Sequence, residues 1–160
     1  MVLLATYIAL ALGFSFLCSL LEATLLSMTP TYLASLESKR PKLGALWREF
    51  KADIDKPLAA ILSLNTIAHT LGAAGAGAQA IQLFGELYFG VISAVLTLMI
   101  LIFSEIIPKT LGARYWQQLA PFCGHMLRWV QWSMYPLVIA AKSLTGWLAP
   151  PNEGPTLSRD

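Results

Sequence analysis

The chain has 160 residues, of which 56% are hydrophobic and only 12% are charged, and its formal net charge is +2. Soluble globular domains carry about 25% charged residues, so this composition excludes an ordinary soluble domain. The small net charge gives no basis for nucleic-acid binding. No nucleophile–base pair or phosphate-binding loop points to an enzyme, so we expect a membrane protein that is not an enzyme.

Three windows are long and apolar enough to cross a bilayer as helices, which takes about 20 residues. They are residues 2–28, 57–84 and 87–108. The first window has no basic residues before it and is longer than a cleaved signal core, so we expect it to be retained. The predicted fold is an all-α membrane protein with three full spans in one domain, residues 1–148. Residues 149–160 are proline-rich and polar, and we expect a disordered tail or a truncation point there.

The basic residues predict the orientation of these spans. Six of them fall in the link between the first and second windows and none comes earlier: Lys39, Arg40, Lys42, Arg48, Lys51 and Lys56. The positive-inside rule places this link in the cytoplasm and the N-terminus outside. Lys109 and Arg114, which follow the third window, agree with a cytoplasmic C-terminus.

The link itself, residues 30–56, has apolar residues at helical spacing, and Pro41 divides it into two short pieces. Amphipathic basic segments of this kind lie along a membrane interface, which is our expectation here. The alternative is a solvated connector, which its aromatic residues disfavour.

Residues 119–148 are hydrophobic but contain Arg128, Pro136 and Lys142. A fourth full span would place the C-terminus outside and leave Arg128 or Lys142 in lipid. We therefore expect a partly embedded segment, either a proline-broken hairpin or an interfacial belt. Tryptophans and tyrosines of this segment, which suit the headgroup level, are Trp129, Trp132, Tyr135 and Trp147.

The second window contains an unusual run of small residues at positions 72–78. Membrane helices use small residues to bring backbones together, because lipid offers no hydrophobic drive for association. The run makes two rows, Ala68, Gly72 and Ala76 on one and Ala73 and Gly77 on the other. We expect tight packing within the protomer or across a dimer, and a glycine-lined pore is the alternative.

Glu105 ends the third apolar window, where a carboxylate costs about 2.5–3.5 kcal/mol on insertion scales and is therefore a functional hypothesis. Pro108 has no amide hydrogen, so the Ser104 carbonyl four residues earlier loses its helical donor. Carboxylate and carbonyl oxygens are the ligands that hard cations such as Mg²⁺ prefer. This interpretation requires Glu105 to face a water-accessible pocket, not lipid, and not to be held by Lys109 or Arg114.

The other two spans also carry polar residues in their cytoplasmic halves. Ser15, Ser19 and Glu22 share one face of the first span, and Glu22 is either a functional acid or simply solvated. On the second span, Asn65 and His69 lie one turn apart. Three helices can therefore converge on one cavity. Its direct ligands would be Ser19, Asn65, Glu105 and the Ser104 carbonyl, and its secondary candidates Ser15, Glu22, Ser63 and His69.

Other metal chemistry fits the sequence less well. The alternative for His69 is an interhelical hydrogen bond. The sequence has no cluster of cysteines and histidines of the kind that binds Zn²⁺. Cys18 and Cys123 are expected to be packed free thiols. A haem bound by His69 and His125 is a further alternative.

Three motifs resemble one known family. The run S-E-I-I-P-K-T-L-G at 104–112 is similar to the G-E-I-x-P-K signature of the CorC/cyclin M family of magnesium transporters. The run S-L-L-E-A at 19–23 resembles the family's S-x-x-E-T/A, and L-N-T at 64–66 resembles its G-N-T. The order and spacing of the motifs match over roughly residues 1–148.

The resemblance implies a domain of three spans with an outside N-terminus and juxtamembrane helices, usually dimeric. It also implies Mg²⁺ export across the plasma membrane, the inner membrane in bacteria, with Na⁺ as the proposed coupling ion. The implied ligands are Ser19, Asn65 and Glu105, with backbone carbonyls near Ser104 and Pro108. Family members normally continue into a pair of cytoplasmic CBS modules, which these 160 residues do not contain. We therefore expect an alternating-access Mg²⁺ transporter, and the alternative is a non-transporting dimeric membrane sensor or scaffold.

Overall fold

The structure is a computed structural model that describes residues 1–148, with the side chains of 141, 142 and 144–148 left undescribed. The expected tail at 149–160 and the side chains of Lys142 and Trp147 therefore lie outside the described part. The elements are α1 (Val2–Ser27), α2 (Pro30–Lys39), α3 (Pro41–Ala52), α4 (Asp55–Phe84), η1 (Glu86–Tyr88), α5 (Phe89–Met99), η2 (Ile100–Ile106) and α6 (Ile107–Leu148). The described residues contain no strand, so the all-α prediction is confirmed.

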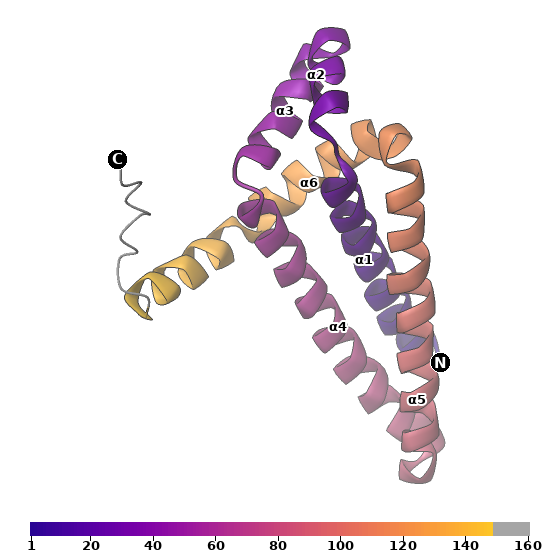
Figure 1. Cartoon of the computed structure of the whole chain (residues 1–160). Coiled ribbons are helices and arrows are strands. Elements are labelled where there is room, and N and C mark those ends of the chain that lie inside the picture. The colour runs from indigo at the N-terminus through magenta and orange to yellow at the C-terminus, as the bar shows by residue number, and fades with distance from the viewer. Residues whose placement is uncertain (149–160) are drawn as a thin grey trace, which may run out of the picture.

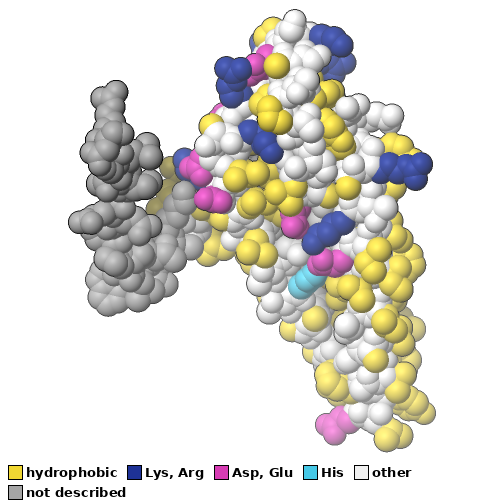
Figure 2. All heavy atoms as spheres, in the orientation of Figure 1, with side chains coloured by type: hydrophobic (Ala, Val, Ile, Leu, Met, Phe, Trp, Pro, Cys, Tyr) yellow, Lys and Arg dark blue, Asp and Glu magenta, His cyan; other side chains and the backbone are white. Residues whose placement is uncertain are grey.

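Three helical stretches are long and apolar enough to cross a membrane, as predicted. They are α1, α4 and the continuous stretch from η1 through α5 and η2 into α6. Figure 1 shows these three rods side by side, with α4 and α5 joined at one end and α1 beside them. In Figure 2 the basic side chains gather at the end of the molecule away from the junction of α4 and α5, and the ends of the spans near this junction are mainly apolar. The apolar and charged parts of the chain are thus separated along the rods.

Small residues let α1 and α4 approach closely. A methyl group added at Gly72 would lie 2.3 Å from the Ala11 side chain, and Ala76 and Ala80 are buried. The expected tight packing therefore occurs within the protomer along the first row of small residues. The second row, with Ala73 and Gly77, lines an apolar cavity of about 660 Å³ between α1, α4 and α5, and no charged residue lines it.

The link between α1 and α4 folds into a pair of short helices, α2 and α3, that extends beyond the ends of the spans (Figure 1). Pro30 and Pro41 each stand at the start of a helix, where the missing amide hydrogen would have no helical acceptor. The Thr29 side chain caps α2 by accepting a hydrogen bond from the Tyr32 amide at 3.3 Å. The predicted division at Pro41 is confirmed, and the location of this pair along a membrane interface stays a prediction.

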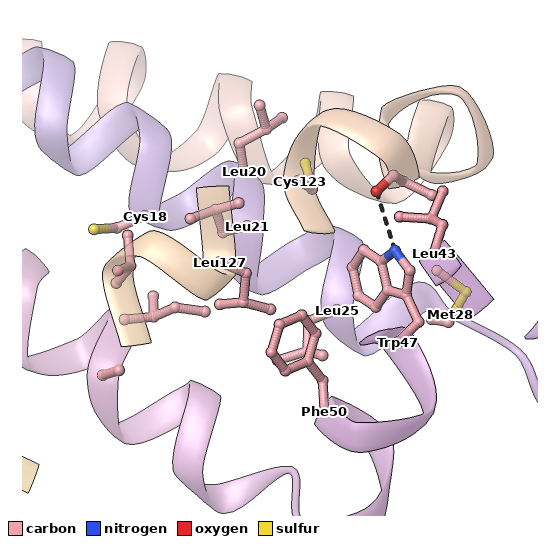
Figure 3. Packing of buried hydrophobic residues seen from close by; sticks show 14 of the residues in the cluster. Cys18, Leu20, Leu21, Leu25, Met28, Leu43, Trp47, Phe50, Cys123 and Leu127 are labelled. Atoms are coloured by element: carbon pink, nitrogen blue, oxygen red, sulfur yellow. Dashed lines mark hydrogen bonds between the residues drawn. The ribbon is translucent and has the colours of Figure 1, made fainter. Parts of the chain in front are cut away.

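The cluster of buried hydrophobic residues lies toward the charged end, where α1, α3 and α6 meet (Figure 3), and includes residues of α2 and α4. The Trp47 indole is fully buried there and donates a hydrogen bond to the Ala120 carbonyl at 3.0 Å. Phe50 packs edge-on against Trp47, and Leu25 and Leu127 are buried beside them. This core fixes the charged ends of the spans relative to one another. Cys18 and Cys123 are buried free thiols, as expected.

The helix α6 continues through Pro121 and Pro136 to Leu148, so the expected proline-broken hairpin is wrong. Pro121 cannot donate to the Gln117 carbonyl, but the Tyr32 hydroxyl of α2 donates to it instead, at 3.1 Å. The chain changes direction earlier, at Tyr115, whose backbone is not helical (φ −110°, ψ 18°). Beyond this corner α6 crosses the ends of the spans and leaves the bundle sideways (Figure 1). The interfacial-belt alternative is consistent with this course, and its depth in a bilayer stays a prediction.

Candidate metal-ion site

The third span changes from α-helix to π-helix just before the charged end. In η2 the hydrogen bonds reach back five residues, so the Ile107 amide donates to the Ile102 carbonyl. The next residue in line is Pro108, which has no amide hydrogen. Pro108 therefore cannot donate a hydrogen bond to the Phe103 carbonyl, five residues back, or to the Ser104 carbonyl, four residues back. Sequence reasoning assumed α geometry and identified only Ser104. Single π turns inside α-helices occur often at functional sites.

The side chain of Ser104 is buried and donates a hydrogen bond to the Ile100 carbonyl at 2.8 Å. The hydrogen of this hydroxyl is thus used within the helix, while the oxygen lone pairs of the hydroxyl and the backbone carbonyl remain able to accept. Pro108 is also fully buried, which holds this turn inside the bundle and not on its surface.

The carboxylate of Glu105 shares a basic partner with a second acid. The Lys109 ammonium lies 3.3 Å from a Glu105 oxygen and 3.5 Å from a Glu22 oxygen. The condition set for the ion-site interpretation, that neither Lys109 nor Arg114 should hold Glu105, is therefore not met by Lys109, and an ion bound by Glu105 would have to displace this ammonium. The physical reason is helix spacing, because residues four apart face the same side. The other basic residue considered, Arg114, lies over the Tyr115 ring instead.

A close contact between α1 and α6 brings Glu22 into this group. A methyl group added at Gly112 would lie 2.9 Å from the Leu20 carbonyl oxygen and 2.7 Å from the Ala23 side chain. Only glycine allows this approach, which aligns Glu22 of α1 with Lys109 of α6. Glu22 is 37% exposed and ion-paired to Lys109, so it belongs to this group of charges, and its role as a functional acid or a solvated one stays a prediction.

The α1–α4 contact carries a second polar group. The His69 Nε2 atom lies 2.6 Å from the Ser15 hydroxyl, so the expected interhelical hydrogen bond of His69 is present. The two helices run antiparallel (Figure 1). One turn further toward the charged end, Ser19 on α1 therefore faces Asn65 on α4.

Two oxygen atoms at this level lack partners. The Ser19 Oγ and Asn65 Oδ1 atoms are buried and make no hydrogen bond within the described part of the chain. A buried polar atom left unpaired costs about 1–3 kcal/mol, so such atoms usually have a reason. Both are oxygens of the kind that bind hard cations.

The remaining secondary candidate, Ser63, is not brought to this group. It lies two residues from Asn65, which is about 200° around an α-helix, so it faces another side of α4. Within residues 1–148 no group of three or more histidine, cysteine, aspartate or glutamate side chains could hold a metal ion. Two carboxylates and neutral oxygens favour a hard cation bound weakly over a transition metal. In Figure 2 an imidazole, acidic groups and a basic group gather on one face where the apolar and charged parts meet.

Comparison with known proteins agrees with these features. Residues 6–160 match the family described as the cyclin M transmembrane N-terminal domain. The chain belongs to the cyclin M family. It is 34% identical to a UPF0053 protein of Synechocystis, over a region that covers 81% of the chain and 37% of that relative. A chloroplastic DUF21 domain-containing protein of Arabidopsis thaliana is 27% identical over 81% of the chain and 20% of its own length.

A third relative, the UPF0053 inner membrane protein YfjD of Escherichia coli, is 29% identical over 59% of the chain and 22% of its own length. The cyclin M domain thus spans roughly a fifth to two fifths of these relatives. Family membership and three apolar helices identify a multi-pass membrane domain. The cyclin M match runs through all the polar groups described above, from Ser15 to Lys109.

Sequence reasoning named Lys109 as a residue that should not hold Glu105, although their spacing of four residues is a readable signal for this ion pair. The close contact at Gly112 had no such signal, because a glycine in a helix does not reveal which neighbour approaches it.

Proposed function

We propose that this domain transports Mg²⁺ across the membrane. The protein ligands of the ion would be Ser19, Asn65 and Glu105, together with a backbone carbonyl near Ser104 or Pro108. The observation that carries the proposal is the pair of buried, unpartnered oxygens on Ser19 and Asn65. A cation between α1 and α4 would supply both atoms with a partner. The proposal further includes export from the cytoplasm by alternating access, a possible role of Na⁺ as coupling ion, a homodimer, and cytoplasmic CBS-type modules as regulatory partners.

The chemistry of the site suits a transported ion better than a resident one. Mg²⁺ requires six oxygens at about 2.0–2.1 Å and loses its waters reluctantly. The neutral oxygens of Ser19 and Asn65 and the Glu105 carboxylate compensate its charge only in part, and the second negative charge of the group, on Glu22, is partly exposed. A site of this kind binds weakly enough to release the ion. The basic residues gathered at one end of the molecule support a cytoplasmic location of that end and an outside N-terminus (Figure 2).

The test is Mg²⁺ flux in liposomes that contain the purified chain and a Mg²⁺-sensitive dye. Glu105→Gln removes the charge with little change in shape, and Asn65→Ala removes the amide oxygen. Both variants should abolish flux. Thr66→Ala is the matched control, because Thr66 is exposed and its hydroxyl bonds only to the Leu62 carbonyl. Normal flux in the Glu105 and Asn65 variants would refute the site.

The same preparation separates a transporter from a sensor or scaffold. A transporter shows both Mg²⁺ binding and Mg²⁺ flux, and each depends on Glu105. Binding that depends on Glu105 without any flux would favour the sensor. The absence of both would favour a scaffold.

A further inference from the structure

One positive charge stands between two negative charges that belong to different helices. The Lys109 ammonium of α6 lies within 3.5 Å of carboxylate oxygens from Glu105 on η2 and Glu22 on α1. It is therefore placed where a cation bound by both carboxylates would be.

The contact is built so that it can open. The side chains of Lys109, Glu105 and Glu22 are 45%, 28% and 37% exposed, so none of them is locked inside the helix bundle. Ion pairs at exposed sites in water are weak. The lysine head also sits on a flexible four-carbon stem, and its exposed face leaves it room to swing away from the two carboxylates.

The charges of the group explain why an ammonium is needed and why it can be replaced. Without Lys109 the two carboxylates would repel each other across the α1–α6 contact. With Lys109 in place the group keeps one net negative charge, which attracts a further cation. With Mg²⁺ in place and Lys109 turned away, the group is neutral. With both cations present it would be positive, so the two compete.

We propose that Lys109 is a tethered competitor of the transported ion: it neutralises Glu22 and Glu105 when no ion is bound, leaves when Mg²⁺ arrives, and returns to help to expel it. This inference rests on the proposed function of the same site. Lys109 is then the residue that sets the affinity for Mg²⁺. The carboxylates must also move, because 3.3 and 3.5 Å exceed the Mg²⁺–oxygen distance of about 2.1 Å.

Two substitutions at Lys109 should act in opposite directions. Lys109→Met keeps the length of the side chain and removes the charge, so the dissociation constant for Mg²⁺ should fall at least about tenfold. Lys109→Arg keeps the charge, and its planar fork can hold a carboxylate with two hydrogen bonds. The arginine variant should therefore bind Mg²⁺ more weakly than the natural chain.

Lys56→Met is the matched control. Lys56 is also half exposed and also paired with a carboxylate, that of Asp53 at 2.7 Å, but it stands at the start of α4, outside the group. Its replacement removes the same charge and should change the Mg²⁺ affinity less than about twofold. This control separates a local competitor from a general change in surface charge.

The measurement is isothermal titration of the purified chain with MgCl₂ at constant pH and ionic strength, for the natural chain and the variants Lys109→Met, Lys109→Arg, Lys56→Met and Glu105→Gln. Tighter binding in the methionine variant with weaker binding in the arginine variant supports the inference. An unchanged or weakened affinity in Lys109→Met, with binding still dependent on Glu105, would overturn the inference alone.

The failure of the proposed function looks different. If neither the natural chain nor Lys109→Met binds Mg²⁺, both the transport site and the inference fall. If only Lys109→Met binds Mg²⁺, the competitor role is supported in its strongest form. Should the methionine variant not fold, the arginine variant decides: affinity equal to or higher than that of the natural chain overturns the inference.

Discussion

Ser19 and Ser15 lie one turn apart on the same face of α1, and the same substitution should change stability in opposite directions at the two positions. Among the described residues the buried Ser19 hydroxyl has no hydrogen-bond partner, whereas the Ser15 hydroxyl lies 2.6 Å from His69 Nε2. Ser19→Ala removes an unpaired polar atom and should stabilise the Mg²⁺-free domain. Ser15→Ala removes a hydrogen bond and leaves a ring nitrogen of His69 without its partner, so it should destabilise the domain.

The magnitudes follow from the burial of these atoms. An unpaired buried polar group costs about 1–3 kcal/mol, and the small void left by alanine offsets part of the gain. We expect Ser19→Ala to add about 1 kcal/mol to the free energy of unfolding. Ser15→Ala should subtract about 1–2 kcal/mol. In a chain of this size each kcal/mol corresponds to about 2–4 °C in the melting temperature.

The assay is thermal unfolding of the purified chain in detergent, first with a chelator and then with increasing Mg²⁺. Mg²⁺ should raise the melting temperature of the natural chain and of Ser15→Ala, because a ligand stabilises the state that it binds. It should have little effect on Ser19→Ala. A destabilised Ser19→Ala variant would show that the hydroxyl has a partner, and full Mg²⁺ stabilisation of that variant would remove Ser19 from the ligand set.

Three further substitutions test the packing that positions the site. Gly72→Ala should force α1 and α4 apart and lower the melting temperature, because the added methyl group would lie 2.3 Å from Ala11. Gly13→Ala is its control: the added methyl group meets nothing within 4 Å, so the melting temperature should stay unchanged or rise. Trp47→Phe should lower the free energy of unfolding by about 1–3 kcal/mol in denaturant titration, since it removes a buried hydrogen bond and leaves a cavity. Gly112→Ala should separate Lys109 from Glu22 and change Mg²⁺ affinity in calorimetry, because its methyl group would lie 2.9 Å from the rigid Leu20 carbonyl.

The sequence was sufficient for the spans because hydropathy adds up along a window and needs no knowledge of neighbours. The predicted window at 57–84 and the observed helix Asp55–Phe84 differ by two residues at one end. The course of α6 was not predictable in this way. Pro121 signalled a lost hydrogen bond, but the hydroxyl that replaces it comes from Tyr32, which only the folded chain brings close.

The candidate site shows the same limit. Ser19, Asn65 and Glu105 could be selected from the sequence because polar residues are rare in spans and their helical spacing is regular. Their pairing depends on the offset between helices, and this offset is set by contacts such as Gly72 with Ala11. The π turn was hidden as well, because a proline shows that a donor is missing and not whether the hydrogen bonds reach back four or five residues.

The polar groups follow one another along α1 in an order that suits the uptake of a hydrated cation. Glu22 is partly exposed at the charged end, Ser19 is buried one turn deeper, and Ser15 is closed off by His69 one turn beyond that. The seven steps along the helix from Ser15 to Glu22 span about 10 Å. An ion entering from the charged end would first meet net negative charge in the presence of water, where attraction requires no dehydration. It would meet the neutral buried oxygens only afterwards, where water must be given up. The Ser15–His69 hydrogen bond, which joins α1 to α4 beyond those oxygens, would then have to open before the ion could go further.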